Sequence, residues 1–239
     1  MKNVDINKVI SQHAEMDGFF TGGFSIKAKK NQREPIVNSD AAAELEKIAG
    51  QVRQCRNCPL GSQRTNAVPG EGSPNAQIMF VGEGPGADED AQGRPFVGRA
   101  GKKLNDIISA CGLERKDVFI GNILKCRPPN NRDPKADEIV SCLPFLQKQI
   151  ETIQPEVIVA LGAPAAKTLL NTSKAIGQLR GQFHEYYAGL GSPSIKVMPT
   201  YHPAYLLRNY SKENRRKVWE DMKQVLEELN LPIPNHPSK

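Results

Sequence analysis

Short apolar runs alternate with amphipathic segments along most of the chain. Four runs are β-branched and apolar nearly throughout, which is typical of strands buried on both faces of a parallel sheet. These predicted strands cover residues 77–83, 117–124, 155–162 and 194–201. Apolar residues at helical spacing predict helices over residues 41–55, 100–112, 136–153, 163–170 and 213–230, and the segment 202–208 connects the fourth strand to the last helix. The alternation predicts a three-layer α/β/α sandwich with a central, mainly parallel four-stranded sheet and functional residues at the carboxyl ends of its strands.

The beginning of the chain lacks this pattern. Residues 1–38 are polar and irregular, so we expect a poorly ordered leader or linker there. Ser39 or Asp40 can cap the first predicted helix. We expect residues 39–239 to form a single domain, in which we find no internal repeat or low-complexity tract.

Composition makes a membrane protein an unlikely class. Apolar residues make up 38% of the 239 residues, which is enough for a core. The apolar runs are far shorter than the roughly 20 residues of a membrane span, and no signal-peptide core precedes the first polar residues. We therefore expect a cytoplasmic protein that works as a monomer without membrane contact.

Basic residues gather in two segments. The net charge is +6 overall, with ten Lys or Arg against four Asp or Glu between Arg94 and Lys135 and five against one between Arg208 and Lys217. Two solvated surfaces would be the simplest explanation. Because both segments flank glycine-rich turns, they fit contacts with a phosphate backbone better.

The first predicted strand runs into a glycine turn that carries acids. Residues 82–86 read Gly-Glu-Gly-Pro-Gly, three acids follow at 88–90, and Phe96 comes a short way on. A dinucleotide-binding turn would need a helix starting at the turn and a second strand ending in an acid about 20 residues later. A helical pattern occupies that place, so this alternative is disfavoured. The chain has no phosphate-binding loop of the G-x-x-x-x-G-K-[ST] type.

The chain contains five cysteines. Cys55 and Cys58 form a C-x2-C pair, and Cys126 and Cys142 follow at a distance, so the four thiolates could hold a [4Fe–4S] cluster. A zinc site is an alternative, although the usual second C-x2-C pair is missing. Four ordinary buried cysteines are the third possibility. Cys111 lies in a helical pattern and is expected to be a small core residue.

A histidine follows the last predicted strand. His202 begins the sequence HPAYLLR, in which Leu206, Leu207 and Arg208 place apolar side chains beside positive charge. Such side chains can insert between stacked bases, so we expect them to contact DNA. The alternative is an amphipathic turn whose leucines pack inward.

Together these segments resemble family four of the uracil-DNA glycosylase superfamily, the iron–sulfur type. The resemblance runs from about residue 55 to 229 and rests on GEGPGADED, GRPFVGRAG, GNILKCRPPNNRDP, HPAYLLR and the four cysteines, in the order of the family. Glu83 separates the chain from relatives that carry Asp, Asn or Ala at this position. Residues 1–40 have no counterpart in the resemblance.

The resemblance implies a role for each site residue. Phe96 would stack on a uracil flipped out of the DNA, and Asn122 would read its edge with the side-chain amide. His202 would donate a hydrogen bond to uracil O2 as negative charge develops, and Glu83 would hold the attacking water. Gly84 and Glu89 would line the pocket. The expected DNA contacts are Arg99, Lys102, Leu206, Leu207 and Arg208, and the expected cluster ligands are Cys55, Cys58, Cys126 and Cys142.

The implied function is a monofunctional uracil-DNA glycosylase that starts base-excision repair on double- or single-stranded DNA. A first alternative is a non-catalytic iron–sulfur DNA-binding module related to the N-terminal segment of phage-type DNA polymerases. It would need the basic segments but not Glu83, Asn122 and His202 together. A second alternative is repair of other deaminated bases such as hypoxanthine or xanthine.

Overall fold

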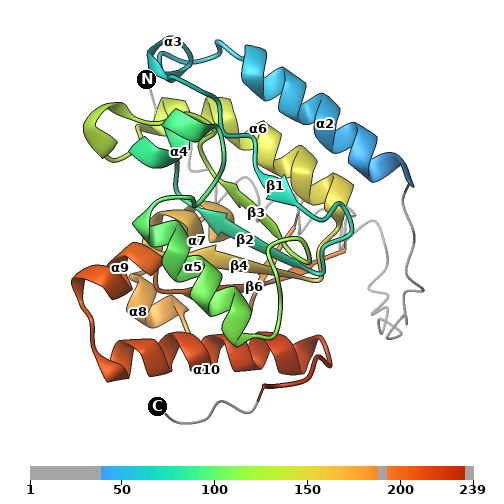
Figure 1. The fold of residues 1–239 in the computed structure, drawn as a ribbon, viewed down its shortest axis with the longest axis vertical. Helices are drawn as coiled ribbons and strands as arrows, with labels where there is room; N and C mark the ends of the chain where they lie inside the picture. Colours follow the sequence, from blue (N-terminus) through green and yellow to red (C-terminus); the bar gives the residue numbers. More distant parts are fainter. Residues whose placement is uncertain (1–38, 188–192, 235–239) are drawn as a thin grey trace, which may run out of the picture. The chain divides into compact units, whose positions relative to one another are not determined.

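Parallel strands form the centre of the protein, as a computed structural model that describes residues 39–187 and 193–234 shows (Figure 1). The strands are β1 (Glu71–Gly72), β2 (Ile78–Gly82), β3 (Phe119–Asn122), β4 (Val157–Leu161), β5 (His184–Tyr186) and β6 (Ile195–Thr200). They lie in the order β1-β3-β2-β4-β6-β5 within one sheet. The predicted leader, residues 1–38, lies outside the described residues.

The four predicted strands are the parallel centre of this sheet. β2 pairs with β3 and β4, and β4 pairs with β6, all in parallel. The prediction of four strands was nevertheless incomplete, because β1 and β5 add antiparallel edges that bring the sheet to six strands. These edge strands have two and three residues, which is too short for a readable pattern.

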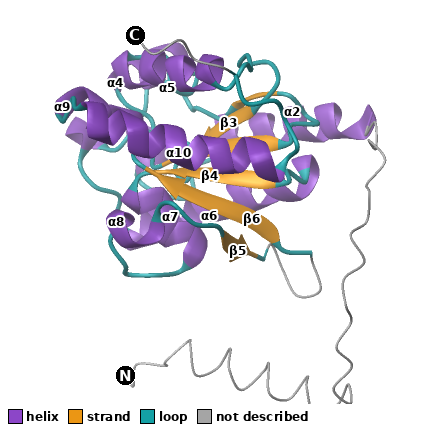
Figure 2. Cartoon of the chain, turned by 90° about the horizontal axis from the view of Figure 1, so that it is seen from below, coloured by secondary structure: helices purple, strands orange, loops and turns teal. Residues whose placement is uncertain are grey.

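Helices cover both faces of the sheet (Figure 2). They are α2 (Ser39–Gln54), α3 (Leu60–Gln63), α4 (Ala87–Gln92), α5 (Arg99–Ala110), α6 (Ala136–Ile153), α7 (Ala163–Leu170), α8 (Ile176–Leu179), α9 (Pro203–Arg208) and α10 (Lys212–Glu228), with a 3-10 turn, η1 (Pro129–Asn131). Apolar residues of α5, α9 and α10 share one core cluster with the sheet. Residues of α6 and α7 share the other. The predicted three-layer α/β/α architecture is therefore confirmed.

The central strands are apolar because helices pack on both faces of the sheet and bury them. All five residues of β2 are buried. Ile78 and Phe80 face the cluster with α5 and α10, whereas Met79 and Val81 face the cluster with α6, because successive side chains point to opposite faces. In the described ranges no helix has the length and apolarity needed to cross a membrane.

Candidate active site

A pocket opens at the carboxyl ends of the parallel strands. β2 and β3 end at Gly82 and Asn122, and β4 and β6 end nearby at Leu161 and Thr200. The pocket brings together seven of the predicted site residues, namely Glu83, Gly84, Glu89, Phe96, Asn122, His202 and Arg208. This is the position expected for a site in an open α/β sheet.

Asn122 lines this pocket and carries an unpaired side-chain acceptor. Its side chain is 1% exposed, and Oδ1 has no hydrogen-bond partner among the described residues. The backbone carbonyl of Asn122 accepts from Nζ of the buried Lys125 at 2.9 Å, which fixes the end of β3. A buried polar atom without a partner is costly, so Oδ1 is suited to a ligand that brings a donor.

Gly82, at the end of β2, leaves room for two side chains that line the pocket. A Cβ atom at this position would lie 2.4 Å from Asn122 Oδ1 and 2.6 Å from Phe96 Cζ. Phe96 itself is buried, and its ring centroid lies 5.7 Å from that of His202. Phe96, Asn122 and His202 are thereby gathered around one space.

His202 is held as a neutral ring. It caps α9, and its Nδ1 accepts a hydrogen bond from the Ala204 amide at 3.1 Å. Burial and the charge of Arg208 lower the pKa of His202 to about 4, although Glu89 acts in the opposite direction. Because Nδ1 accepts, the proton of the neutral ring is on Nε2, which makes His202 a neutral donor.

Glu83 lies directly after β2 on a rigid turn. The carbonyls of Gly82 and Glu83 accept from the amides of Ile123 and Leu124, each at 2.9 Å, so the pairing of β2 with β3 continues into the turn. Burial and the negative charge of Asp133 raise the pKa of Glu83. A carboxylate with a raised pKa is a stronger proton acceptor than a free one, and its ionised form can accept a hydrogen bond from a water.

Glu89 holds the wall of the pocket. Its carboxylate accepts from the amides of Gly86 at 3.1 Å, Val97 at 2.8 Å and Gly98 at 2.9 Å. It therefore joins the glycine turn before α4 to the loop that carries Phe96. The sequence placed Glu89 in the pocket but assigned it no role, and these contacts identify it as a positioning residue.

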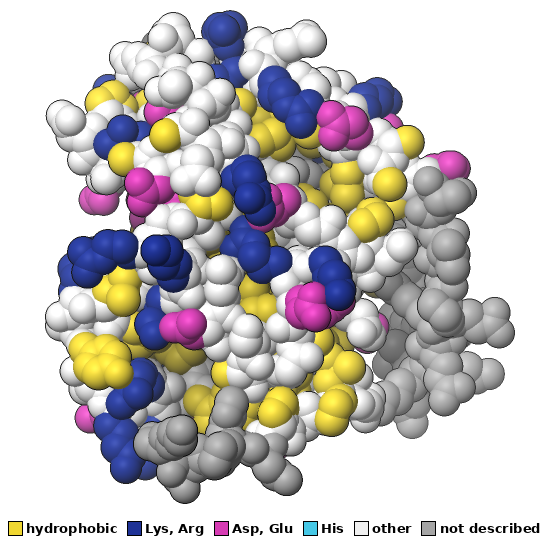
Figure 3. All heavy atoms as spheres, in the orientation of Figure 1, with side chains coloured by type: hydrophobic (Ala, Val, Ile, Leu, Met, Phe, Trp, Pro, Cys, Tyr) yellow, Lys and Arg dark blue, Asp and Glu magenta, His cyan; other side chains and the backbone are white. Residues whose placement is uncertain are grey.

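The predicted DNA contacts divide into two groups. Arg99, Lys102 and Arg208 are exposed and Leu207 is half-buried, so their DNA contacts remain predictions. The prediction for Leu206 is wrong, because its side chain is 3% exposed and packs in the core. Helix α9 begins at Pro203, and this turns Leu206 toward the sheet. Lys and Arg side chains gather over α9 and the start of α10 (Figure 3).

Sequence reasoning missed part of the pocket. Asp133 lines it, and so do Gly162 and Pro164 after β4. Gly162 has a φ of 90°, and a Cβ atom there would lie 3.0 Å from His202 Cβ. A glycine as the last residue of a predicted strand was the available signal for this third strand end.

The four predicted ligands line a separate cavity. Cys55, Cys58, Cys126 and Cys142 all border it, whereas Cys111 lies in the main core. Three sulfurs accept hydrogen bonds: Cys126 from Arg64 Nη1 at 3.0 Å, Cys142 from the Lys125 amide at 3.2 Å and Cys55 from the Asn57 amide at 3.5 Å. Such bonds are typical around thiolates that ligate a metal centre.

The spacing and ionisation of these cysteines bear on what they could hold. Within the described residues, no three Cys, His, Asp or Glu side chains are gathered as they would be around a single metal ion. In a four-iron cluster each thiolate binds a different iron, so the sulfurs are spread more widely. Burial raises the pKa of Cys142 to about 11, opposed by Lys125, and a bound metal would be needed to keep it as thiolate.

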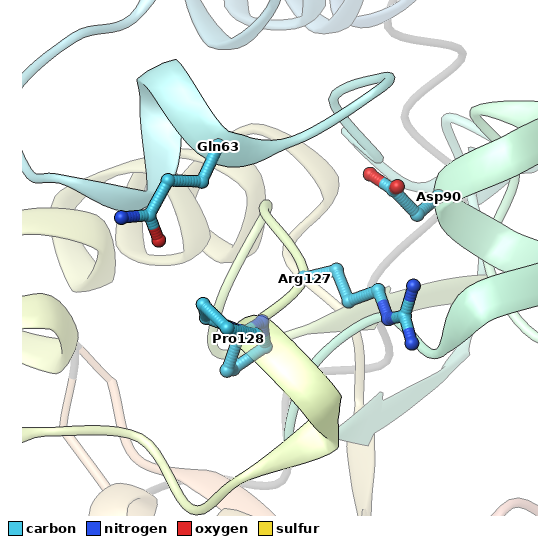
Figure 4. A pocket seen from close by; sticks show the side chains of 5 residues that line it. Gln63, Asp90, Arg127 and Pro128 are labelled. Atoms are coloured by element: carbon cyan, nitrogen blue, oxygen red, sulfur yellow. The ribbon is translucent and has the colours of Figure 1, made fainter.

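The segment after Cys126 joins the cysteine cavity to the pocket. Arg127 and Pro128 line a shallow hollow with Gln63 of α3 and Asp90 of α4 (Figure 4). Pro128 also lines the main pocket. Arg127 Nε donates to Asn131 Oδ1 at 2.8 Å, which ties the segment to the turn η1.

Sequence comparisons agree with this fold and site. The sequence model of the uracil DNA glycosylase superfamily matches residues 69–223, so the chain belongs to this superfamily. The chain is 47% identical over 191 residues to the type-4 uracil-DNA glycosylase of Saccharolobus solfataricus, covering 78% of this chain and 87% of the relative. It is 49% identical over 182 residues to that of Thermotoga maritima, covering 76% and 92%. Within the superfamily it therefore falls among the type-4 enzymes.

A DNA polymerase of Bacillus phage SP01 is also similar. It is 31% identical over 140 residues, which cover 58% of this chain but 14% of the polymerase. This match concerns a small part of a much longer protein. It therefore does not favour the non-catalytic alternative over the type-4 enzymes, which match along most of their length.

Proposed function

We propose that the protein hydrolyses the N-glycosidic bond of uracil in DNA. The observation that carries this proposal is the unpaired, buried Oδ1 of Asn122 in the same pocket as Glu83, Phe96 and His202. Uracil N3–H would supply the missing donor, and the amide NH2 would donate to O4. Cytosine presents the opposite pattern at both positions, which would leave buried polar groups unpaired.

The chemistry follows from the position of charge in the transition state. The base must leave the duplex to reach the pocket, where Phe96 would stack on it. Cleavage at C1′ develops positive charge on the sugar and negative charge on uracil. Neutral His202 would donate to O2, a bond that strengthens as the charge grows, and Glu83 would hold the water and favour the cationic sugar.

The test is excision from defined oligonucleotides. The protein is incubated with duplexes that contain uracil, thymine, cytosine or hypoxanthine at one position, followed by alkaline cleavage of abasic sites. We expect cleavage for uracil only, and only after alkali, because we assign no amine nucleophile for strand cleavage. Binding of the uracil duplex without excision would instead favour the non-catalytic alternative.

The pocket also predicts an unusual pH profile. We expect the titration of His202 to cause no loss of single-turnover rate between about pH 8 and about pH 6, where an ordinary histidine titrates, because His202 is neutral throughout. The rate should fall as the pH drops through the raised pKa of Glu83, since only its ionised form holds the water as proposed. Glu83→Gln should abolish this acid limb at a lower overall rate. A loss centred near pH 6.5 that persists in Glu83→Gln would contradict the assignment of a neutral histidine.

We further propose that the four cysteines hold a [4Fe–4S] cluster. The support is that four thiols from three chain segments border one cavity and that three of the sulfurs receive hydrogen bonds. The cluster would act as a structural crosslink between the loop at 55–58 and the residues at 126 and 142. Glycosidic hydrolysis needs no electron transfer, so the reaction is assigned to the pocket residues.

The basic start of α10 is proposed to contact DNA phosphates. Arg215 and Arg216 are exposed there. Replacing both with alanine should weaken binding equally for uracil-containing and normal duplexes and reduce the slope of log K against log salt by about one unit per lost contact. Lys47, exposed on α2, provides a control. A slope that is as steep in the double variant as in Lys47→Ala would show that this surface faces away from DNA.

A further inference from the structure

The backbone of Phe96 is held in an unusual conformation. Its φ is 50°, in the left-handed region that bulky side chains seldom adopt. Such a conformation persists only when the surrounding structure determines it. Since Phe96 is the residue proposed to stack on the base, the contacts that hold its backbone also set the position of its ring.

Contacts on both sides of Phe96 fix this conformation. After Phe96 in the chain, the amides of Val97 and Gly98 donate to the Glu89 carboxylate. Gly101 of α5 packs against the Phe96 carbonyl so closely that a Cβ atom there would lie 1.9 Å from its oxygen. Arg115 binds the carbonyls on either side of the Phe96 amide and Cα: it donates from Nη1 to Phe96 O at 3.1 Å and from Nη2 to Pro95 O at 2.8 Å.

Arg115 is itself held in place by two other side chains. Its Nε and Nη2 donate to Oε1 of Glu71 on β1, and its Nη1 donates to Asn105 Oδ1 of α5 at 2.9 Å. Burial opposes ionisation of Glu71, but Arg94 and Arg115 outweigh it and lower the pKa of that carboxyl. The guanidinium thus connects a sheet edge, a helix and the loop of Phe96.

We propose that Arg115 is a positioning residue that sets the stacking ring of Phe96 without contacting the base. Arg115 is not among the residues that line the pocket. The inference rests on the proposed function, because stacking on uracil is the role of Phe96 in it. The planar guanidinium of Arg115 donates to two adjacent backbone carbonyls and, on its other edges, to the side chains of Glu71 and Asn105. The ammonium of a lysine cannot bond to all four groups from one position, so lysine would replace Arg115 poorly.

The test is a double-mutant cycle on the single-turnover rate of uracil excision at saturating enzyme. Arg115→Ala should lower the rate by about 10- to 100-fold, the loss typical of a small misplacement of a reacting or stacking group. Phe96→Ala should lower it at least as much. The double variant should be no slower than Phe96→Ala, because Arg115 acts through that ring. Losses that multiply would overturn the proposal, as would a wild-type rate in Arg115→Ala.

Arg94→Ala is the matched control. Arg94 also pairs with Glu71, with Nε at 2.8 Å from Oε2, but no hydrogen bond from it to the carbonyls of Pro95 or Phe96 is found in the structure. Its loss should leave the rate unchanged. Adding guanidinium ion at non-denaturing concentration should partly restore Arg115→Ala and leave Phe96→Ala unchanged, which a general loss of structure would not show.

Arg115→Lys keeps the argument testable if Arg115→Ala is poorly folded. It should melt close to wild type yet excise uracil more slowly, and a wild-type rate would count against the proposal. In the same assay, uracil excision by the wild type and by Arg94→Ala tests the proposed function itself. If neither excises uracil, that function is wrong, whereas multiplying losses in an active enzyme contradict only the role of Arg115.

Discussion

His202→Ala is expected to lower the single-turnover rate of uracil excision by about 10²–10³, with a smaller effect on DNA affinity. Loss of one preorganised donor at a developing negative charge typically has this effect. The donor here is the Nε2–H of a neutral ring, fixed by the bond from the Ala204 amide to Nδ1. Because the hydrogen bond strengthens only as uracil becomes anionic, the rate suffers more than binding.

Glu83→Ala should show the same separation of rate from affinity, since a water held for attack and a stabilised sugar cation also matter mainly in the transition state. His184 on β5 offers a matched histidine control, because its Nε2 bonds to the Leu179 carbonyl at 2.9 Å. His184→Gln should retain the wild-type rate. Excision at the wild-type rate by both Glu83→Ala and His202→Ala would show that the active site lies elsewhere.

Cys142→Ala is expected to lose iron, brown colour and soluble yield together. We expect the wild type, purified without oxygen, to contain about four iron and four sulfide per chain. Cys142 comes from α6 and receives the Lys125 amide, so its loss should free α6 from the segment that follows β3. A metal centre that crosslinks segments contributes folding free energy directly, so its loss should lower the yield.

Cys111→Ala is the control for the cluster. Cys111 is as buried as Cys126 and Cys142 but packs with Ile108 and Val118 in the main core. Its variant should keep both iron and colour, with only the modest destabilisation of a small core truncation. A colourless, zinc-loaded wild type with full activity would contradict the proposed cluster. Iron content should also be measured for every active-site variant, because a lost cluster would imitate a catalytic defect.

The strands that position the site could be predicted from the sequence, but the residues that hold the site loops in place could not. β2, β3 and β4 are buried throughout, and Glu83 and Asn122 lie together at the carboxyl ends of these strands, as expected from the sequence. β1 has two residues and no pattern of its own. Its Glu71 therefore carried no signal, although it orients Arg115 across 44 positions of sequence.

Local patterns also failed where tertiary contacts decide the structure. Helix α4 has three acids in its first turn and no apolar period, and its start depends on Glu89 accepting from Gly86. The apolar residues after His202 were expected to contact DNA, yet Leu206 is needed in the core. Sequence shows that a leucine lies beside positive charge, but not which of two adjacent leucines faces inward.

The absence of a side chain at Gly82 has a consequence for which substitutions can change the base preference of the pocket. One missing Cβ atom makes room for both the amide of Asn122 and the ring of Phe96. A larger residue at Gly82 would press on the amide of Asn122 and the ring of Phe96 at once, so their two proposed roles cannot be tuned separately from this position. We therefore expect changes of base preference to arise at Asn122, Phe96 or the residues behind them rather than at position 82 alone.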